Sequence, residues 1–572
     1  MFKTALADLI KIFFEGEKEM KKTNVLVGLL ACGVLLTACG SGGNTDGSGN
    51  ASNGSDNSGI ELGTVGEFPV VKEKISMTMM GPGTGMAEWK DMPVFQSMAE
   101  KTNIDLTFTT PPSADFATKL NLAFASGDLP DILFGTDTNS LTPAMEMDYG
   151  NQGILVPLED LIQENMPNFS KILEENPDIA KSITTPDGHI YSLPMIHRGE
   201  TAIWPRGPLW YNGEWLEALD VKELPKTTDE FYDLLVRFRD EDPNGNGKQD
   251  EIPLTDVKMD STRPWLLAAF GLTDRSIEEI DGKVVYAPIT ENYKEFVTYM
   301  NKLYSEKLLD PEVYSQADEQ KKAKGQNNQI GLFPDWFSFF TTGRTEKESV
   351  MDPMFYPLTS EINPDRISPA STRLGRATFA ITSDNPSPAA ALRWVDYFYS
   401  PEGNDFLSVG PEGAFWEYAE NDKGEQVRVF TEGVDLDNTE ESRAKVTPNY
   451  GITVPTMAFP DSKADFPPVI ANANDEVDTT FNDFLAAETQ EKIEPFAKVT
   501  FPLLYLTTEE SDKVRDVATD LKTYVEQMEA KFITGVEPIE NWDKYVQTIE
   551  SMGVEDYVAI HQQAYDRWAS TE

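Results

Sequence analysis

The chain has 572 residues, of which 40% are hydrophobic and 10% aromatic, a composition typical of globular proteins and long enough for two substantial lobes. Its formal net charge of −48 at pH 7 repels nucleic acid and anionic lipid headgroups, so the composition excludes a nucleic-acid-binding function. Both cysteines, Cys32 and Cys39, lie near the N-terminus, so the rest of the chain has neither disulfides nor thiol chemistry.

The N-terminal residues 1–38 have the features of a signal-peptide region. A basic start precedes an apolar run at residues 25–36, which is shorter than a typical membrane-spanning helix. The sequence LTAC at residues 36–39 resembles the bacterial lipobox, which predicts lipidation, such as palmitate, on Cys39; ordinary secretory cleavage is the alternative. Residues 39–66 are rich in Gly, Ser, Asn and Asp, which predicts a flexible tether.

The first part of the body alternates strands with helices. The spacing of apolar residues predicts strands at 75–79, 104–108 and 132–135, and helices at 92–102 and 116–125. This alternation indicates an α/β lobe with crossover connections.

The loop DPNGNGKQDE at residues 242–251 has the ligand spacing of an EF-hand-type calcium loop, and it follows a helix predicted from residue 227. Oxygen-bearing side chains stand at positions 1, 3, 5 and 9, and Lys248 offers its carbonyl at position 7. Position 12 is Pro253, so Glu251 is the available bidentate carboxylate. The alternative is a solvated turn that binds nothing.

The stretch ELPKTTDEFYDLLVRFRDEDPNGNGKQDEIPL, residues 223–254, resembles the calcium-loop region of extracellular solute-binding protein family 1. The resemblance is to lipoproteins that feed carbohydrate ABC importers, including the alginate-oligosaccharide-binding proteins. The segment ASGDLPDILFG at 125–135 and the order of later motifs extend the resemblance to about residues 70–570. It implies a structural Ca²⁺ ion held by Asp242, Asn244, Asn246, Lys248, Asp250 and Glu251.

The resemblance also implies the fold and its division along the chain. The expected class is α/β, with a two-lobed periplasmic-binding-protein-like (Venus-flytrap) fold, a hinge between the lobes and C-terminal helices. The first lobe is expected to combine residues 67–195 with 368–425, and the second to combine 196–367 with 426–572. The C-terminal part is predicted to be helical from residue 507, where a capping box precedes a helical repeat of apolar residues.

Signatures of catalysis are sparse in this sequence. It has three histidines and lacks HExxH, GxxxxGK[ST] and GxSxG motifs. A glycosidase pair could still be present among the many acidic residues, because the separation of two carboxylates is set by tertiary structure. We nevertheless expect a protein that is not an enzyme.

Sugar binding requires flat apolar faces for stacking and planar polar groups for hydroxyls. Ligands of α/β lobes bind outside the carboxyl ends of strands, so residues that follow predicted strands, loops or lobe crossings are the candidates. The candidate ligand-binding residues are Trp89, Asp137, Trp204, Arg206, Trp265, Trp336 and Trp416. A packing role is the alternative for each tryptophan, and a surface ion pair is the alternative for Arg206.

These features indicate a lipid-anchored solute-binding protein that captures a carbohydrate, in particular an oligosaccharide, and delivers it to an ABC transporter permease. We expect a monomer on the extracellular face of the cell membrane, of the Gram-positive surface-lipoprotein type, attached through its lipid anchor alone. Three alternatives remain: a peptide or other small-solute receptor on the same scaffold, a polysaccharide-degrading enzyme, and an adhesive lipoprotein.

Overall fold

The computed structural model describes residues 59–202, 207–436, 438–458, 466–476 and 479–570. The predicted signal region, Cys39 and most of the tether lie outside these ranges. Within the described ranges, no helix is both long and apolar enough to span a bilayer. Two large and separate hydrophobic clusters form the cores of two lobes.

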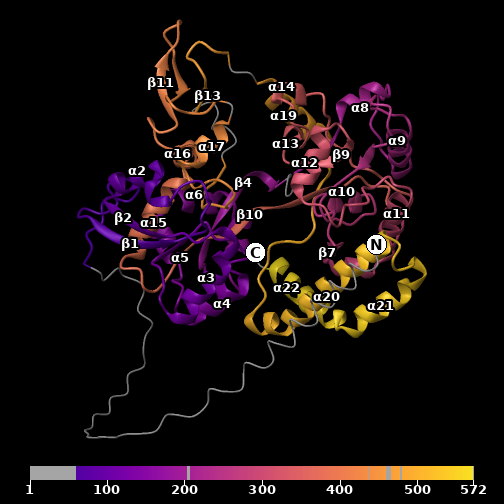
Figure 1. Ribbon diagram of the computed structural model, residues 1–572. Coiled ribbons are helices and arrows are strands. Elements are labelled where there is room, and N and C mark those ends of the chain that lie inside the picture. The colour runs from indigo at the N-terminus through magenta and orange to yellow at the C-terminus, as the bar shows by residue number, and fades with distance from the viewer. Residues whose placement is uncertain (1–58, 203–206, 437, 459–465, 477–478, 571–572) are drawn as a thin grey trace, which may run out of the picture. The chain divides into compact units, whose positions relative to one another are not determined.

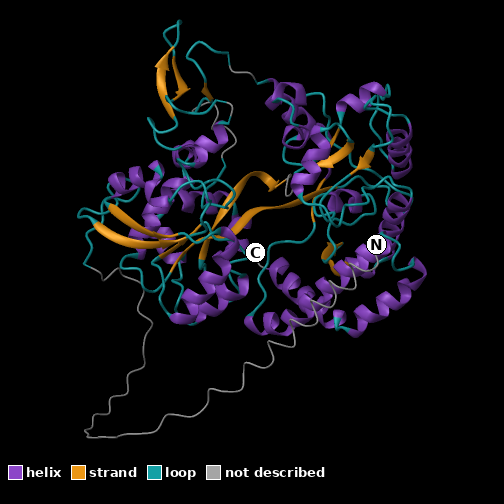
Figure 2. Cartoon of the chain, in the orientation of Figure 1, coloured by secondary structure: helices purple, strands orange, loops and turns teal. Residues whose placement is uncertain are grey.

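A six-stranded sheet forms the centre of the first lobe (Figures 1 and 2). Its strands are β1 (Ile75–Met80), β2 (Ile104–Thr109), β3 (Ile132–Phe134), β4 (Ser192–Ala202), β10 (Ser368–Ile381) and β14 (Ala497–Val499). β1 pairs in parallel with β2 and β3, whereas β10 runs antiparallel to β3 and β4 and parallel to β14. The predicted strand-helix-strand-helix-strand order is therefore confirmed, and β10 joins it from far along the chain.

Helices of the first lobe pack on this sheet and share its core. They are α2 (Pro93–Thr102), α3 (Ser113–Ser126), α4 (Pro143–Asn151), α5 (Glu159–Asn165), α6 (Pro167–Glu175), α7 (Pro177–Ile183), α15 (Pro388–Asp396) and α16 (Pro401–Val409). Helix α15 begins where the Ser387 side chain accepts a hydrogen bond from the Ala390 amide. Its Trp394 then packs edge to face against Phe134 of β3, with 6.0 Å between ring centres.

The second lobe contains a smaller sheet with the order β5-β9-β6, formed by β5 (Leu209–Tyr211), β6 (Ile252–Leu254) and β9 (Ile330–Pro334). β6 and β9 are parallel, so their carboxyl ends lie at the same edge. A separate hairpin joins β7 (Ile277–Ile280) to β8 (Lys283–Tyr286). The helices are α8 (Gly213–Ala218), α9 (Thr228–Asp240), α10 (Thr262–Ala268), α11 (Glu291–Ser305), α12 (Asp318–Gln326), α13 (Ser338–Thr342), α14 (Glu346–Ser349) and α19 (Thr480–Lys492).

Helix α9, which leads into the oxygen-rich loop, begins with half of a capping box. The Thr227 hydroxyl accepts from the Glu230 amide at 3.2 Å. The Glu230 carboxylate, however, accepts from the amide of Lys226 at 2.8 Å and not from that of Thr227. The apolar face of the helix is anchored by Phe231 and Phe238, both fully buried, so the start of the loop is held in place by the core.

Three C-terminal helices complete the second-lobe core: α20 (Thr508–Ile533), α21 (Trp542–Ser551) and α22 (Val554–Ser570), drawn in yellow in Figure 1. Both halves of the predicted capping box are present at Thr507 and Glu510. Leu521 and Val525 of α20 are buried among second-lobe residues. The predicted amphipathic helix is therefore confirmed.

The expected boundary between residues 425 and 426 is wrong, because it divides a hairpin. β11 (Trp416–Glu420) pairs with β12 (Gln426–Phe430), and β12 pairs with β13 (Val469–Ile470). A short helix, α17 (Thr439–Ala444), follows the hairpin. Val454 beyond it is buried in the first-lobe core, so the first lobe extends well past residue 425.

Candidate functional site

The oxygen-rich loop after α9 is organised by its own carboxylates. Asp242 has a positive φ of 48° and accepts hydrogen bonds from the amides of Asn246 and Gly247 at 3.1 and 3.0 Å. Asp250 accepts from the side-chain amides of Asn246 and Gln329 at 2.9 and 3.0 Å. The loop therefore folds back so that its first and ninth positions contact the same residue, Asn246.

Glu251 lacks a partner for one of its carboxylate oxygens. Its Oε1 is buried and forms no hydrogen bond. Burial raises the pKa of this carboxyl, and the negative charges of Asp250 and Asp242 raise it further. A bound cation would give the buried, unpartnered oxygen a partner and would offset the charges of the nearby carboxylates. Within the described residues, however, no three His, Cys, Asp or Glu side chains are already gathered as metal ligands.

Three of the candidate tryptophans, Trp89, Trp265 and Trp416, lie in packed interiors, and Trp265 is 2% exposed within the second-lobe core. Trp89 is 1% exposed and stacks on Phe95, with ring centres 5.2 Å apart, so it packs in the first-lobe core and does not present a ligand-binding face. Trp416 is 8% exposed; its indole donates to the Gly410 carbonyl at 3.1 Å, and the Arg428 guanidinium lies 4.0 Å from the ring centre. The structure thus gives all three residues the packing role. Trp204 and Arg206 fall outside the described residues.

Asp137 and Trp336 occupy the carboxyl ends of strands in different lobes. Asp137 follows β3 and lines a small cavity of about 180 Å³ with Ser113, Asn139 and Thr453. Burial raises the pKa of Asp137, but hydrogen bonds from Asn139 and Ser140 outweigh burial and hold the pKa below its usual value, so the group is a carboxylate at neutral pH.

Trp336 lies two residues after the end of β9 in the second lobe, and its side chain is 51% exposed. Phe337 and Phe340 follow it in the chain; Phe340 of α13 is 44% exposed and packs against Phe337 with ring centres 5.6 Å apart. An exposed indole is suited to stacking on the apolar face of a ligand.

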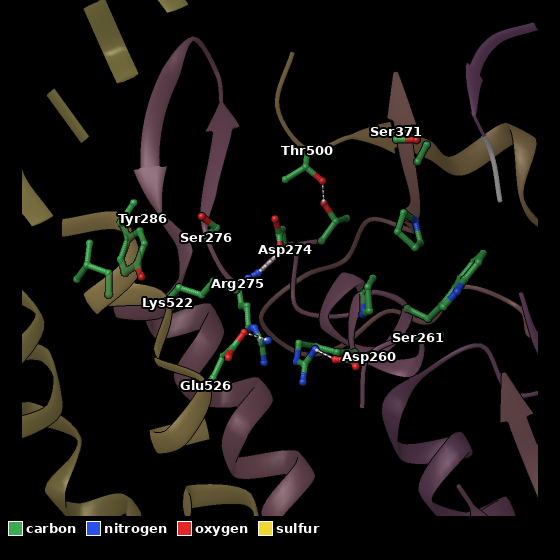
Figure 3. A pocket seen from close by; sticks show the side chains of 18 of the residues that line it. Asp260, Ser261, Asp274, Arg275, Ser276, Tyr286, Ser371, Thr500, Lys522 and Glu526 are labelled. Atoms are coloured by element: carbon green, nitrogen blue, oxygen red, sulfur yellow. Dashed lines mark hydrogen bonds and ion pairs between the residues drawn. The ribbon is translucent and has the colours of Figure 1, made fainter. Parts of the chain in front are cut away.

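A cavity of about 940 Å³, which we call the hinge cavity, is shown in Figure 3. One wall is formed by α10, which includes Trp265, and by the segment that follows α10. Ser371 lies in β10 and Thr500 lies just after β14, and both of these strands belong to the first-lobe sheet. Lys522 of α20 lies across the cavity from Ser371. Trp265 borders this cavity, but its side chain is 2% exposed and packs edge to face against Phe355, so the structure gives it a packing role as well.

A buried ionic network supports one side of the hinge cavity. The Arg263 Nε donates to both carboxylate oxygens of Glu529 at 2.8 and 3.0 Å, and the Tyr293 hydroxyl donates to the same carboxylate. The side chains of Arg263 and Glu529 are 6% and 1% exposed. Arg275 pairs with Glu526, as Figure 3 shows. These contacts fix α10 to α20 and so fix the shape of the cavity.

Sequence reasoning did not find this network, although one signal was present. Glu529 stands in α20 between Met528 and Phe532, both buried. A charge among the apolar positions of an amphipathic helix requires a buried partner. The partner Arg263, however, lies far away in the sequence, and no local pattern identifies it.

Glu278 of β7 should make stability depend on pH. It is fully buried, and its carboxylate accepts hydrogen bonds from the amides of Thr273 and Asp274, which line the hinge cavity. Burial raises its pKa from 4.5 to about 7. The folded protein therefore binds this proton more tightly than the unfolded chain, and the group's contribution to stability is lost as the pH rises from 4.5 through 7.

We expect Glu278→Gln to remove this pH-dependent loss of folding stability, about 3 kcal/mol. The glutamine amide has no charge to bury, and its oxygen can still accept both hydrogen bonds. Urea-unfolding midpoints measured between pH 5 and 8 test this. Glu279→Gln is the matched control, since successive side chains of a strand point to opposite faces. The prediction is wrong if Glu278→Gln and the unmodified protein show the same pH dependence.

Comparisons with known proteins agree on one family. Residues 86–405, more than half of the chain, match the family described as bacterial extracellular solute-binding proteins. The fructooligosaccharide ABC transporter substrate-binding protein FusA of Streptococcus pneumoniae is 30% identical over 84% of this chain and 87% of its own length.

Solved structures of FusA have the same fold. The structure in complex with kestose is 27% identical, covers 87% of this chain and 100% of its own, and has a TM-score of 0.70. An EF-hand mutant of FusA in complex with fructo-nystose is 26% identical, with the same coverage and TM-score. With its two lobes and its matched residues, this chain belongs to the bacterial extracellular solute-binding protein family.

Proposed function

We propose that this protein captures an oligosaccharide between its two lobes and delivers it to the permease of an ABC importer. The observation that carries the proposal is the exposed indole of Trp336 at the carboxyl end of β9, in a family whose relative FusA is named for binding fructooligosaccharides. Asp137, at the carboxyl end of β3, supplies a carboxylate that can accept hydrogen bonds from sugar hydroxyls. The ligand would favour a closed arrangement of the lobes that the permease recognises.

The proposal assigns no reaction to this chain, and ATP hydrolysis belongs to the importer. The predicted lipid on Cys39 would hold the protein, as a monomer, at the extracellular face of the membrane. Peptides and other small solutes are the alternative ligands for the same scaffold. Release of new reducing ends from a glycan would instead reveal an enzyme.

The loop after α9 is proposed to hold a structural calcium ion. Asp242, Asn244, Asn246, Asp250 and Glu251 would supply side-chain oxygens, and Lys248 would supply its carbonyl. The buried, unpartnered Oε1 of Glu251 supports this assignment, because a hard cation gives that oxygen a partner. The ion would neutralise these carboxylates and fix the connection between α9 and β6.

Replacing Trp336 with alanine is expected to weaken oligosaccharide binding roughly thirty-fold, about 2 kcal/mol, because the stacking surface is lost. The fold should be unaffected, since half of this side chain is already exposed. Titration calorimetry with neutral oligosaccharides measures the change. Phe68→Ala removes another exposed aromatic ring, which packs on Tyr397, and should leave the dissociation constant unchanged.

Two outcomes would contradict the proposal. Equal affinities of Trp336→Ala and the unmodified protein would remove Trp336 from the binding site. Binding of short peptides, with no binding of any glycan, would keep the fold and replace the proposed ligand class.

A further inference from the structure

We infer that Asn246 and Gly247 form a self-modification site, where the asparagine loses its side-chain amide unless calcium holds the loop. This inference rests on the proposed function of the loop as a calcium site. In an Asn-Gly pair the glycine nitrogen can attack the side-chain carbonyl carbon of the asparagine, because glycine has no side chain to shield that nitrogen. The sequence has four such pairs, of which Asn244-Gly245 and Asn246-Gly247 lie in this loop. The pair at residues 53–54 lies outside the described ranges.

The reaction needs only water as a co-reactant. The Gly247 nitrogen forms a bond to Cγ of Asn246 while the bond from Cγ to Nδ2 breaks. Nδ2 leaves as ammonia, after gaining the proton that the Gly247 nitrogen gives up. Water then opens the resulting cyclic imide at either of its two carbonyl groups. The product is aspartate or isoaspartate, so a neutral amide is replaced by a carboxylate in both cases.

Three features of the loop favour this reaction at Asn246. The Gly247 amide donates to Oδ2 of Asp242 at 3.0 Å, so a carboxylate is in place to take the proton of the attacking nitrogen. Oδ1 of Asn246 accepts from the Lys248 amide at 2.8 Å, which polarises the carbonyl group that is attacked. Asn246 and Gly247 are also exposed, and an added Cβ at Gly247 would meet no atom within 4 Å, so water can reach the imide.

The neighbouring pair in the same loop lacks the carboxylate. The Gly245 amide donates to the main-chain carbonyl of Asp242 at 3.0 Å, and a carbonyl oxygen is too weak a base to take its proton. Gly245 otherwise matches Gly247, since their φ angles are +67° and +73° and an added Cβ would meet no atom within 4 Å at either. Asn244 is also the less exposed of the two asparagines. We therefore expect Asn246 to be modified faster than Asn244.

A third pair, Asn212-Gly213, is prevented from reacting by its packing. The Gly213 amide also donates to a carboxylate, that of Asp352, at 2.9 Å. Asn212, however, is 2% exposed, and its side-chain amide donates to Asn328 at 2.8 Å. An added Cβ at Gly213 would lie 2.0 Å from the Met351 carbonyl oxygen, so this segment has no room to form the imide. This pair should stay intact in the folded protein.

Calcium should suppress the modification of Asn246. Asp242 and Asn246 are both proposed ligands, so the ion would neutralise the proton acceptor and fix the side chain that has to turn toward the Gly247 nitrogen. The modification should in turn weaken calcium binding. Isoaspartate adds a methylene group to the backbone at this position and so displaces the ligands that follow it in the loop. Molecules that have been without calcium would then lose the site irreversibly.

Peptide mapping by mass spectrometry measures the modification. The full chain is incubated in neutral buffer with calcium or with chelator, and fragment spectra assign the converted residue within each peptide. In chelator, Asn246 should be converted faster than Asn244, and Asn212 should remain unchanged. With calcium at a hundred times its dissociation constant, only about one loop in a hundred is empty, so conversion of Asn246 should slow roughly a hundredfold.

Two substitutions test the chemistry in chelator, where calcium has no part. Asp242→Asn replaces the proton acceptor with an amide of the same shape, and it should slow conversion of Asn246 at least about tenfold, because general bases contribute this much or more. Gly247→Ala shields the attacking nitrogen and should also slow it. Gly245→Ala is the matched control, since it places the same methyl group on the same backbone conformation, and it should leave the conversion of Asn246 unchanged.

Equal conversion rates of Asn246 and Asn244 in chelator would refute the modification site, as would an Asp242→Asn variant that is converted like the unmodified protein. Conversion that calcium does not slow, in a protein whose melting temperature calcium raises, would refute the protection by calcium. Equal melting temperatures in calcium and in chelator would instead refute the proposed calcium site itself, so the two failures are distinguishable.

Discussion

Removing calcium is expected to lower the melting temperature of this protein, and Glu251→Gln should abolish the effect. An ion present at a hundred times its dissociation constant adds about 2.7 kcal/mol to the stability of the folded state. Glu251 contributes the buried carboxylate that lacks a partner, so its amide variant should bind the ion poorly. Melting curves in calcium and in chelator measure the difference.

The effect of Glu251→Gln on the melting temperature should have opposite signs in calcium and in chelator. With calcium the variant is less stable, because a charged ligand is lost. In chelator it is at least as stable as the unmodified protein, because burial and two nearby carboxylates disfavour the charge of Glu251. Glu241→Gln, which alters a surface pair with Arg237 just before the loop, serves as the control. Equal melting of the unmodified protein with and without chelator would show that the loop is only a turn.

Glu529→Ala is expected to lower the free energy of unfolding by roughly 3–5 kcal/mol. The substitution leaves the guanidinium of Arg263 buried without its carboxylate, and it also removes the acceptor of the Tyr293 hydroxyl. Urea unfolding followed by tryptophan fluorescence measures the loss. Glu526→Ala is the matched control on the same helix, since this residue is 38% exposed and its ion pair should contribute less than about 1 kcal/mol.

A double substitution separates charge burial from lost packing. Arg263→Met combined with Glu529→Leu replaces both charges with apolar groups of similar size, and it should be far more stable than Glu529→Ala. If the double variant is as unstable as Glu529→Ala, the network does not act through its buried charges. Equal losses for Glu529→Ala and Glu526→Ala would lead to the same conclusion.

Local patterns predicted local structure well. The helices predicted from Thr227 and Thr507 both begin there, because a cap joins a side-chain oxygen to a helical amide only a few residues away in the sequence. The rule that ligand residues follow strands placed Asp137 and Trp336 at strand ends. Both signals depend on a few consecutive residues.

Tertiary placement could not be predicted in the same way. Trp89 follows a glycine-rich loop, but it turns inward, because Gly81 has no side chain and an added Cβ would lie 2.3 Å from the indole. The hinge cavity collects residues from α10, β10, α20 and α22, which are widely separated in the sequence. No local sequence pattern indicates that these residues lie together in the folded protein.

Because β10 lies in the middle of the first-lobe sheet, this sheet can form only after β10 has been synthesised. β3 ends at Phe134 and its neighbour β10 begins at Ser368, so all of β5 to β9 leaves the ribosome before the first sheet can close. Until then β3 is an unprotected edge, and pairing across such a long stretch of chain is slow. A fragment that ends before Ser368 therefore lacks the middle of its own sheet, and truncation there cannot yield an independent first lobe.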